Sequence, residues 1–512
     1  MFPHDLVGLF FCTKMKNKIQ NIFWFRNDLR LNDNLPLYES SNFKNVAAIY
    51  IYDTDIVNSQ DFGKMHLDFI NDSLREISIR FKQSGSYLNI FQGNALNILK
   101  SISNHHDIKN IFSHHEVRNA IACDIDIKIK NWCLARGIHW QLFQRNGVIK
   151  DLKNRNGWAK SWHSEMKKPL IPVPDISKFK KLESTGYILD FGRFGLENVE
   201  YTKSFVGGED NARYQLNNFL NETSQTYSKD ISSPRKAFKS CSRLSSYLTY
   251  GNLSIRYIVK KTKERQDFLR KNKIKNGWLG SLSAFSSRLR WHCHFIQKLE
   301  MQPNLENTNM VRAFDKIRTD SNTDYFLRWC DGEVGFPMVD ACMRFLKKNG
   351  WINFRMRAML VSFASYNLWL DWRKTSKYLS KYFIDYEPGI HYNQFQMQSG
   401  VTGINAIRIY NPIKQQTDHD PDGNFVREWV PQLKDVPNDY LQYPHLMSDK
   451  LQKKTGCIIE KNYPKPIVDL RISSLQARKN IFSIKSLSET KKQSNLAYQM
   501  HGSRRKLKSG KG

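Results

Sequence analysis

The sequence predicts an α/β domain built on a parallel five-stranded sheet, followed by an all-α domain. Three observations support this. Up to about residue 150, short apolar runs alternate with longer amphipathic stretches. From Glu209 to Pro444 the apolar residues recur at helical spacing, and a proline-rich stretch lies in between. The 512 residues are enough for two or three domains with a sizeable core.

Five apolar runs in the first part have the length and composition of buried strands. Amphipathic stretches such as Met65 to Gln83 separate them and have helical spacing. This alternation favours a parallel sheet with helices on both faces. No G-x-G-x-x-G segment is present, so a dinucleotide-binding version of the fold has no support. The expected strands are Ile22–Phe25, Val46–Ile51, Tyr87–Phe91, Ile111–Phe112 and Trp140–Phe143.

The change in pattern along the chain predicts five segments. We expect an N-terminal extension over 1–20, the α/β domain over 21–165 and a connector over 166–207. A helical domain should follow over 208–480, with long helices such as Leu327 to Leu346 and Trp351 to Trp372. Residues 481–512 are polar and basic, which is typical of a disordered tail.

The charge balance points to an anionic partner. Lys and Arg number 79 against 48 Asp and Glu, a net charge of +31 with a pI near 9.7. Such a field attracts nucleic acid. A compositional bias toward Lys, Asn and Ile is the alternative explanation. Hydrophobic residues at 40% and aromatic residues at 13% exclude a disordered chain, despite a mean hydropathy of -0.58.

Cysteine and histidine spacing predicts neither a disulfide framework nor a metal site. The eight cysteines contain no C-x-x-C pair. His292, Cys293 and His294 are consecutive, so on a helix they point about 100° apart and cannot close on one ion. No apolar run reaches the ~18 residues of a membrane span, and Leu6 to Cys12 lacks the flanks of a signal peptide. We therefore expect a cytoplasmic protein without a membrane partner.

Four motifs occur in order over about 400 residues. They are the segment Phe23 to Arg30 with Asp33 and Asn34, the segment Ser242 to Leu248 with Gly251, Leu253 and Ser254, the segment Gly335 to Arg344, and the segment Arg408 to Pro412 with Phe425, Arg427, Trp429 and Pro431. Together they resemble the photolyase/cryptochrome flavoprotein family over residues 20–480. The resemblance implies an α/β antenna domain followed by an all-helical FAD domain, as the periodicity predicts.

The resemblance also implies an FAD site. A serine-containing turn that opens a helix offers backbone N–H groups and hydroxyl donors to a diphosphate, although an ordinary helix cap also explains it. A cation near a flavin stabilises its reduced anionic form. A second antenna chromophore, of folate or deazaflavin type, is a further expectation. The implied FAD residues are Tyr227, Ser242, Arg243, Leu244, Ser245, the ion pair Arg357 and Asp385, Tyr386, Glu387, and His391 facing flavin N5, with Asn393 two residues on.

The DNA contacts are implied in the same way. Trp291 and Trp351 match two tryptophans on which a flipped pyrimidine dimer stacks, and each stacked base contributes about 1 to 3 kcal/mol. Core tryptophans with solvated basic neighbours are the alternative. Arg288 occupies a position where cyclobutane-dimer photolyases carry glutamate, and Phe354 one where they carry asparagine. The expected phosphate contacts are Arg344, Arg355, Arg373 and Arg288 itself.

The family's tryptophan relay survives only at Trp372. Phe395 takes the place of its flavin-proximal member, and Thr319 or Asp320 that of its surface member. Photoreduction should therefore fail or be rerouted through Tyr392 or Tyr382. No histidine pair follows Trp351, which argues against repair of (6-4) photoproducts.

Two functions follow from the resemblance. The first is a light-dependent DNA photolyase, a lyase that splits cyclobutane pyrimidine dimers by electron transfer from excited reduced FAD. The second is a cryptochrome-like blue-light photoreceptor without repair activity. For the first we expect a monomer bound to DNA, preferably UV-damaged DNA, and associated with the nucleoid.

Overall fold

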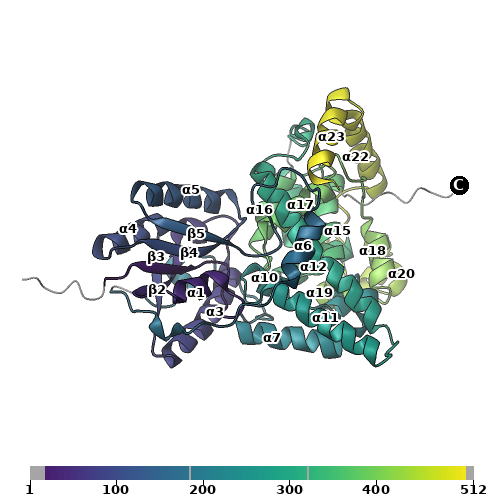
Figure 1. The fold of residues 1–512 in the computed structure, drawn as a ribbon. Coiled ribbons are helices and arrows are strands. Elements are labelled where there is room, and N and C mark those ends of the chain that lie inside the picture. Colours follow the sequence, from purple (N-terminus) through teal and green to yellow (C-terminus); the bar gives the residue numbers. More distant parts are fainter. Residues whose placement is uncertain (1–17, 184–185, 320–321, 503–512) are drawn as a thin grey trace, which may run out of the picture.

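The computed structural model describes residues 18–183, 186–319 and 322–502. The chain forms an α/β part and a helical part that lie side by side, with the α/β part at the left of Figure 1. Residues 1–17, most of the expected N-terminal extension, lie outside the described residues. None of the helices in the described ranges is long and apolar enough to cross a membrane.

The α/β part contains the predicted five-stranded sheet, and all of its strand pairs are parallel. The strand order is β3-β2-β1-β4-β5, so β1 lies at the centre with β2 on one side and β4 on the other. Every residue of β1 and β2 is buried, which explains their unbroken apolar sequences. The strands are β1 (Asn21–Phe25), β2 (Val46–Asp53), β3 (Leu88–Gly93), β4 (Asn110–His115) and β5 (His139–Gln144).

Helices cover both faces of this sheet. The longest, α3, spans Lys64–Gln83 as its apolar spacing predicts, and it buries Phe69, Leu74 and Phe81 against the core. Local side chains fix several helix starts; Asn34, for example, accepts a hydrogen bond from Leu37 N at the start of α1. The other helices of this part are α1 (Leu35–Ser41), α2 (Thr54–Val57), α4 (Ala95–His105), α5 (Ala120–Ala135) and α6 (Trp158–Lys167).

The segment after α6 contains little regular structure. Short 3₁₀ turns form at Ile176–Lys178 and Phe191–Phe194. Backbone and side-chain hydrogen bonds hold it against the sheet, including Gly186 N to Ile90 O at 2.7 Å and Asn71 Nδ2 to Leu189 O at 2.7 Å. The chain thus runs along the α/β part before entering the helical part.

The helical part is built from many short and medium helices (Figure 1). The longest, α12 (Trp278–Met301), packs against α11 (Ile255–Lys271) and α17 (Pro388–Ser399). The remaining helices up to residue 446 are α7 (Glu209–Asn218), α8 (Tyr227–Asp230), α9 (Pro234–Ser240), α10 (Ser245–Thr249), α13 (Thr323–Asp331), α14 (Pro337–Asn349), α15 (Phe354–Ser362), α16 (Trp372–Ser380), α18 (Pro412–His419), α19 (Asn424–Trp429) and α20 (Asn438–Leu441).

Two predicted long helices are each interrupted. The pattern from Leu327 to Leu346 is split between α13 and α14, because Gly332 and Gly335 adopt positive φ and Pro337 starts the second helix. The pattern from Trp351 to Trp372 begins in a loop, continues as α15 and a π-helical turn over Phe363–Asn367, and ends where α16 starts. The apolar pattern in the sequence continues through both interruptions, because the residues that connect the helices are also buried.

The expected tail disorder is wrong for residues 481–502. Helix α22 spans Leu470–Lys485, and α23 spans Ser488–His501 after it. Helix α23 buries Thr490, Ala497 and His501, and His501 Nε2 lies 2.9 Å from Gln302 Oε1. A few buried contacts therefore order a segment whose composition is polar; residues 503–512 lie outside the described residues.

One core joins the two parts. The Phe69 ring of α3 contacts the rings of Tyr247 and Tyr250, with centroids 5.3 and 5.0 Å apart. Leu29 N donates to Tyr250 O at 2.9 Å, and Gly251 has no room for a Cβ because it would overlap the Asn27 carbonyl. The first and second motifs of the sequence therefore meet at this junction.

Candidate functional site

The turn before α10 has the properties of a ligand-binding backbone. Arg243 adopts φ +50°, a conformation that costs about 1 to 3 kcal/mol for a residue other than glycine and clusters at ligand sites. Ser242 Oγ accepts from Leu244 N at 3.4 Å. Arg243 Nε and Ser246 Oγ are buried and have no hydrogen-bond partner among the described residues. Buried unpaired polar atoms are costly, so this turn fits a polar ligand such as a diphosphate.

Arg357 and Asp385 form the expected ion pair. Arg357 Nη2 donates to both carboxylate oxygens of Asp385 at 2.8 Å. The guanidinium lies 4.0 Å from the Phe383 ring centre, and Arg357 Nε donates to Ile352 O. The Asp385 side chain is 5% exposed and that of Arg357 is 24% exposed. The pair therefore lies at the edge of the core, and part of the Arg357 side chain is open to solvent.

Glu387 and Tyr386 point toward the α/β part. Burial raises the pKa of Glu387 to about 7, and its side chain lines a cavity of about 210 Å³ with Arg145 and Ile296. The Tyr386 hydroxyl donates to Asp61 Oδ2 at 2.8 Å. Tyr386 and Glu387 belong to the stretch that was expected to contact the flavin. Their side chains contact groups at the boundary between the two parts.

His391 and Asn393 lie on different sides of α17. His391 Nε2 lies 3.0 Å from Ser376 O, and burial lowers the pKa of this histidine to about 4, so its ring is neutral. Asn393 Nδ2 donates to Phe295 O and Gly389 O, and its buried Oδ1 has no hydrogen-bond partner within the described part of the chain. A neutral imidazole that donates through Nε2 can still accept at Nδ1.

The two tryptophans expected to stack on a lesion have different surroundings. Trp291 on α12 is 43% exposed, and the Arg288 guanidinium lies over its ring at 4.4 Å. Trp351 is 6% exposed and packs against Phe238 at 6.0 Å between ring centres. Tyr227, expected at the FAD phosphates, is buried between Phe219 and Phe285.

Two of the arginines expected to contact phosphates are engaged within the protein. Arg344 donates to Gly332 O and Gln432 Oε1. Arg373 forms ion pairs with Asp315 and Asp371, both at 3.0 Å, so its charge is neutralised locally. Arg355 keeps a partly exposed side chain 6.0 Å from the Tyr410 ring centre.

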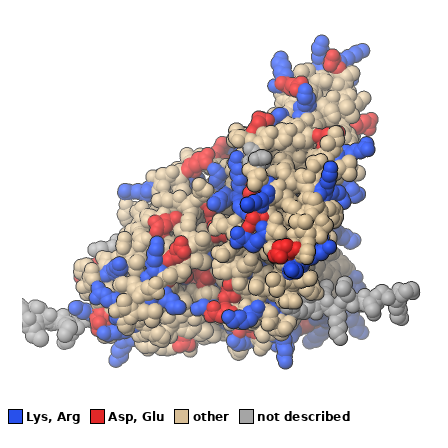
Figure 2. Space-filling view, turned by 90° about the horizontal axis from the view of Figure 1, so that it is seen from above, with Lys and Arg blue, Asp and Glu red and all other residues tan. Residues whose placement is uncertain are grey.

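Lys and Arg are nevertheless spread over the molecule. Figure 2 shows basic side chains over both parts in the view from above, with fewer acidic side chains between them. The described ion pairs join many of them to carboxylates, such as Lys64 to Asp68 and Lys348 to Glu200, while the full chain keeps a net charge of +31. The face seen in Figure 2 therefore presents positive charge to a polyanion over much of its area.

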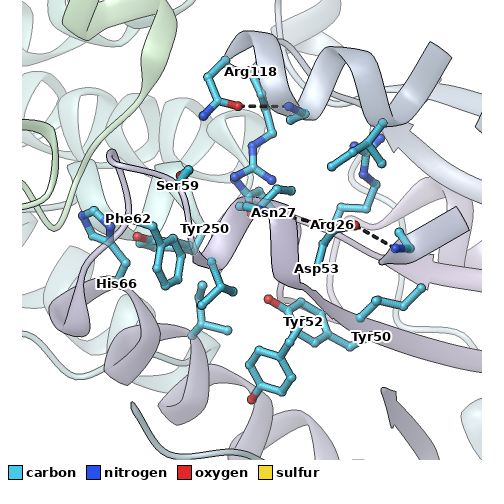
Figure 3. Close-up of a pocket in the computed structure, with 18 of the residues that line it drawn as sticks. Arg26, Asn27, Tyr50, Tyr52, Asp53, Ser59, Phe62, His66, Arg118 and Tyr250 are labelled. Carbon is cyan, nitrogen blue, oxygen red and sulfur yellow. Dashed lines mark hydrogen bonds between the residues drawn. The ribbon is translucent and has the colours of Figure 1, made fainter. Parts of the chain in front are cut away.

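A small cavity lies at the carboxyl ends of β1 and β2 (Figure 3). Figure 3 shows Arg118, Tyr250, Tyr50 and Tyr52 among the residues that line it. Beside it, Arg26 pairs with Asp126 through two hydrogen bonds of 2.9 and 2.7 Å. The cavity volume is about 70 Å³. Ligand pockets for larger molecules measure roughly 300 to 1,000 Å³, so this cavity is smaller than such pockets with the side chains as they lie here.

Trp372 is buried and lies within an aromatic cluster. Its Nε1 donates to Asn309 Oδ1 at 2.7 Å, and its ring contacts Tyr392 at 6.4 Å between centres. The Phe395 ring lies tilted against the His391 ring, with 4.5 Å between ring centres. Thr319 is described, whereas Asp320 lies outside the described residues.

The sequence did not point to Asp61, Arg118 or Tyr250, which line the cavity of Figure 3. No motif surrounds Asp61 or Arg118. Tyr250 follows the second motif closely, and its place at the junction of the two parts was the available signal.

Comparison with known proteins identifies the family. Residues 21–158 match the DNA photolyase domain, and residues 285–483 match the FAD binding domain of DNA photolyase. A deoxyribodipyrimidine photo-lyase of Alkalihalophilus pseudofirmus is 31% identical over 279 residues, covering 54% of this chain and 55% of that protein. Cryptochrome-2 of Arabidopsis thaliana is 26% identical over 482 residues, covering 89% and 78%.

The fold comparison agrees. A bacterial class III photolyase from Agrobacterium tumefaciens superimposes with a TM-score of 0.78 at 24% identity, over 93% of this chain and 100% of that one. The five-stranded parallel sheet, the helical part beside it and the two matched domains agree on one family. The chain belongs to the photolyase/cryptochrome family.

Proposed function

We propose that the protein is a light-dependent DNA repair flavoprotein that splits cyclobutane pyrimidine dimers. The observation that carries this proposal is the exposed Trp291 with the Arg288 guanidinium over its ring, on a strongly basic molecule. An exposed indole can stack on an extruded base, and a guanidinium can donate to a base carbonyl or a phosphate. The partner is DNA, preferably UV-damaged DNA, and the protein acts as a monomer near the nucleoid.

We propose that FAD binds non-covalently between the turn at Ser242 to Ser245 and the pair Arg357 and Asp385. The unpaired Arg243 Nε and Ser246 Oγ support this placement, because a phosphate or ribose would satisfy them. When bound and reduced, FAD supplies the electron that splits the dimer under light. Asp385 holds the Arg357 cation in place, and neutral His391 offers Nδ1 as an acceptor.

On this proposal, residues 21–165 form the antenna domain and 208–480 the FAD and DNA domain, joined by 166–207. A second antenna chromophore of folate or deazaflavin type stays a proposal for the α/β domain, and no step proposed here depends on it.

A cryptochrome-like blue-light photoreceptor is the second candidate. Arg288 in place of a glutamate and Phe354 in place of an asparagine favour it, because both positions would face the lesion in a repair enzyme. Phe354 is exposed and Arg288 forms no ion pair with a carboxylate among the described residues. In this case light would change the flavin, and no lesion would be turned over.

One illumination assay separates the two. FAD-loaded, pre-reduced protein is exposed to blue light with an oligonucleotide containing a cyclobutane dimer, and restored pyrimidines are measured against a dark control. We expect splitting, and a larger loss in splitting rate than in affinity for Arg288→Ala, because the cation stabilises charge that arrives on the dimer. Arg290→Ala is the matched control, since Arg290 lies on the same helix and contacts His163 instead.

If the protein binds damaged and undamaged duplex equally and splits no dimers under light, the repair function is refuted. The photoreceptor function then takes its place.

A further inference from the structure

A buried cluster of two tyrosines and one carboxylate joins the two parts of the molecule. Tyr386 Oη donates to Asp61 Oδ2 at 2.8 Å, and the hydroxyls of Tyr386 and Tyr392 lie 2.8 Å apart. Tyr392 Oη also lies 3.4 Å from Asp61 Oδ2. Asn119 Nδ2 donates to the same carboxylate oxygen at 2.9 Å, which holds Asp61 in position.

The cluster is in direct contact with Trp372. The Tyr392 and Trp372 rings lie 6.4 Å apart between centres, and the rings of Tyr386 and Tyr392 lie 6.2 Å apart. Tyr392 and Trp372 are almost completely buried, at 0% and 1% exposure. The rings of Trp372, Tyr392 and Tyr386 therefore form a continuous path. This path ends at the Asp61 carboxylate, at the boundary with the α/β part.

The chemistry of a phenol makes this arrangement specific. A tyrosine that loses an electron becomes strongly acidic, so the electron leaves readily only where a base takes the proton in the same event. Burial raises the pKa of both tyrosines, so their hydroxyls keep the proton until oxidation. The Asp61 carboxylate, at hydrogen-bond distance, is that base.

Other tyrosines of the described residues lack one of these features. Tyr378 lies in an aromatic group with Phe326 and Trp329, but its hydroxyl donates to the Cys330 carbonyl, which cannot hold a proton. Tyr463 donates to Asp340 at 2.7 Å and has no ring contact with Trp372. The pair Tyr386 and Tyr392 combines the base with the ring contact.

We propose that Tyr392 and Tyr386 are a redox-active pair that reduces Trp372, with Asp61 as the proton acceptor. One electron passes from Tyr392 to the oxidised indole of Trp372, and the Trp372 ring becomes neutral again. The Tyr392 proton moves to Tyr386 Oη while the Tyr386 proton moves to Asp61, which leaves one neutral tyrosyl radical and one protonated carboxyl. A photoexcited oxidised flavin, if bound as proposed above, would be the oxidant of Trp372, so this inference rests on the proposed function.

The pair takes the place of the relay's surface member, which falls on Thr319 or Asp320 in this chain, and it does not replace the flavin-proximal member at Phe395. Neither phenylalanine nor threonine is an electron donor under these conditions, so Trp372 has no indole partner at the positions that the family uses. The missing electron then resides on a tyrosine inside the protein, and because its proton has moved to the Asp61 carboxylate, the reverse electron transfer is slowed.

The test uses the full chain loaded with oxidised FAD, illuminated and trapped by freezing. Electron paramagnetic resonance distinguishes a tyrosyl from a tryptophanyl radical, and transfer is followed in H₂O and D₂O. Wild type should give a tyrosyl signal that forms more slowly in D₂O. Tyr392→Phe should lose this signal, and Asp61→Asn should lose it while leaving the tryptophanyl signal of Trp372.

Tyr378→Phe is the matched control, because it removes a hydroxyl from a neighbouring aromatic group without touching the carboxylate, and it should keep the signal. Flavin absorbance and circular dichroism must match wild type in each variant, and Asp61→Glu should restore the signal.

A tyrosyl signal that persists in Tyr392→Phe, or a wild type with FAD bound and a tryptophanyl radical alone, would overturn the proposal and leave the proposed function standing. A chain that retains no FAD would overturn both.

Discussion

Glu387→Gln should abolish a large pH dependence of stability. The Glu387 carboxyl is fully buried at the start of α17, and burial raises its pKa from the ordinary value of 4.5 to about 7. Arg145 and Arg118 oppose this shift and Glu116 reinforces it, while His115 lines the same cavity. The folded protein therefore favours the protonated carboxyl, whereas the unfolded chain ionises near pH 4.5.

The sign and size follow from linkage. Because the folded-state pKa of this acid is raised, its contribution to stability is present at low pH and is lost as the pH rises from about 4.5 to about 7. At 1.36 kcal/mol for each pKa unit, the loss amounts to about 3 kcal/mol. The side chain lines a cavity of about 210 Å³ that has room for water, so this figure is an upper bound.

The assay is urea denaturation of wild type and Glu387→Gln between pH 5 and pH 8, at matched FAD content. Glutamine resembles the protonated acid, so the two proteins should be similar at pH 5, and the variant should be more stable by up to about 3 kcal/mol at pH 8. Glu222→Gln is the matched control because Glu222 is exposed. A stability difference that is the same at pH 5 and pH 8 would refute the reasoning.

Three further predictions concern the helical part. Gly389→Ala should destabilise the protein by about 1 to 3 kcal/mol and reduce FAD retention, because its Cβ would lie 2.6 Å from the Ile296 backbone; an unchanged thermal midpoint would contradict this. Truncation after Ile484 removes α23 with its buried His501, so the thermal midpoint should fall. The affinity for undamaged duplex should fall as well, and a salt titration of binding measures this loss. Trp291→Ala should cost roughly 1 to 3 kcal/mol of preference for damaged over undamaged DNA in a binding titration, and a full preference with intact FAD content would exclude stacking on this indole.

The sequence by itself determined the fold class and the family. Strands β1 and β2 are buried on both faces, so their apolar runs were continuous and local. The ion pair Arg357 and Asp385 was also predictable, because the resemblance to the family implied an ion pair at these two positions. These features depend on residue type and order alone.

Tertiary structure decided which side chains are available. Arg373 was expected to contact phosphate, yet Asp315, 58 residues away, neutralises it. Helix α23 looked disordered by composition because the contact of His501 with Gln302, 199 residues away, is invisible in the local pattern. The cluster of Asp61 with Tyr386 joins residues 325 apart. Burial and pairing set the energy of a charged or polar group, and both depend on neighbours that are brought together only when the chain folds.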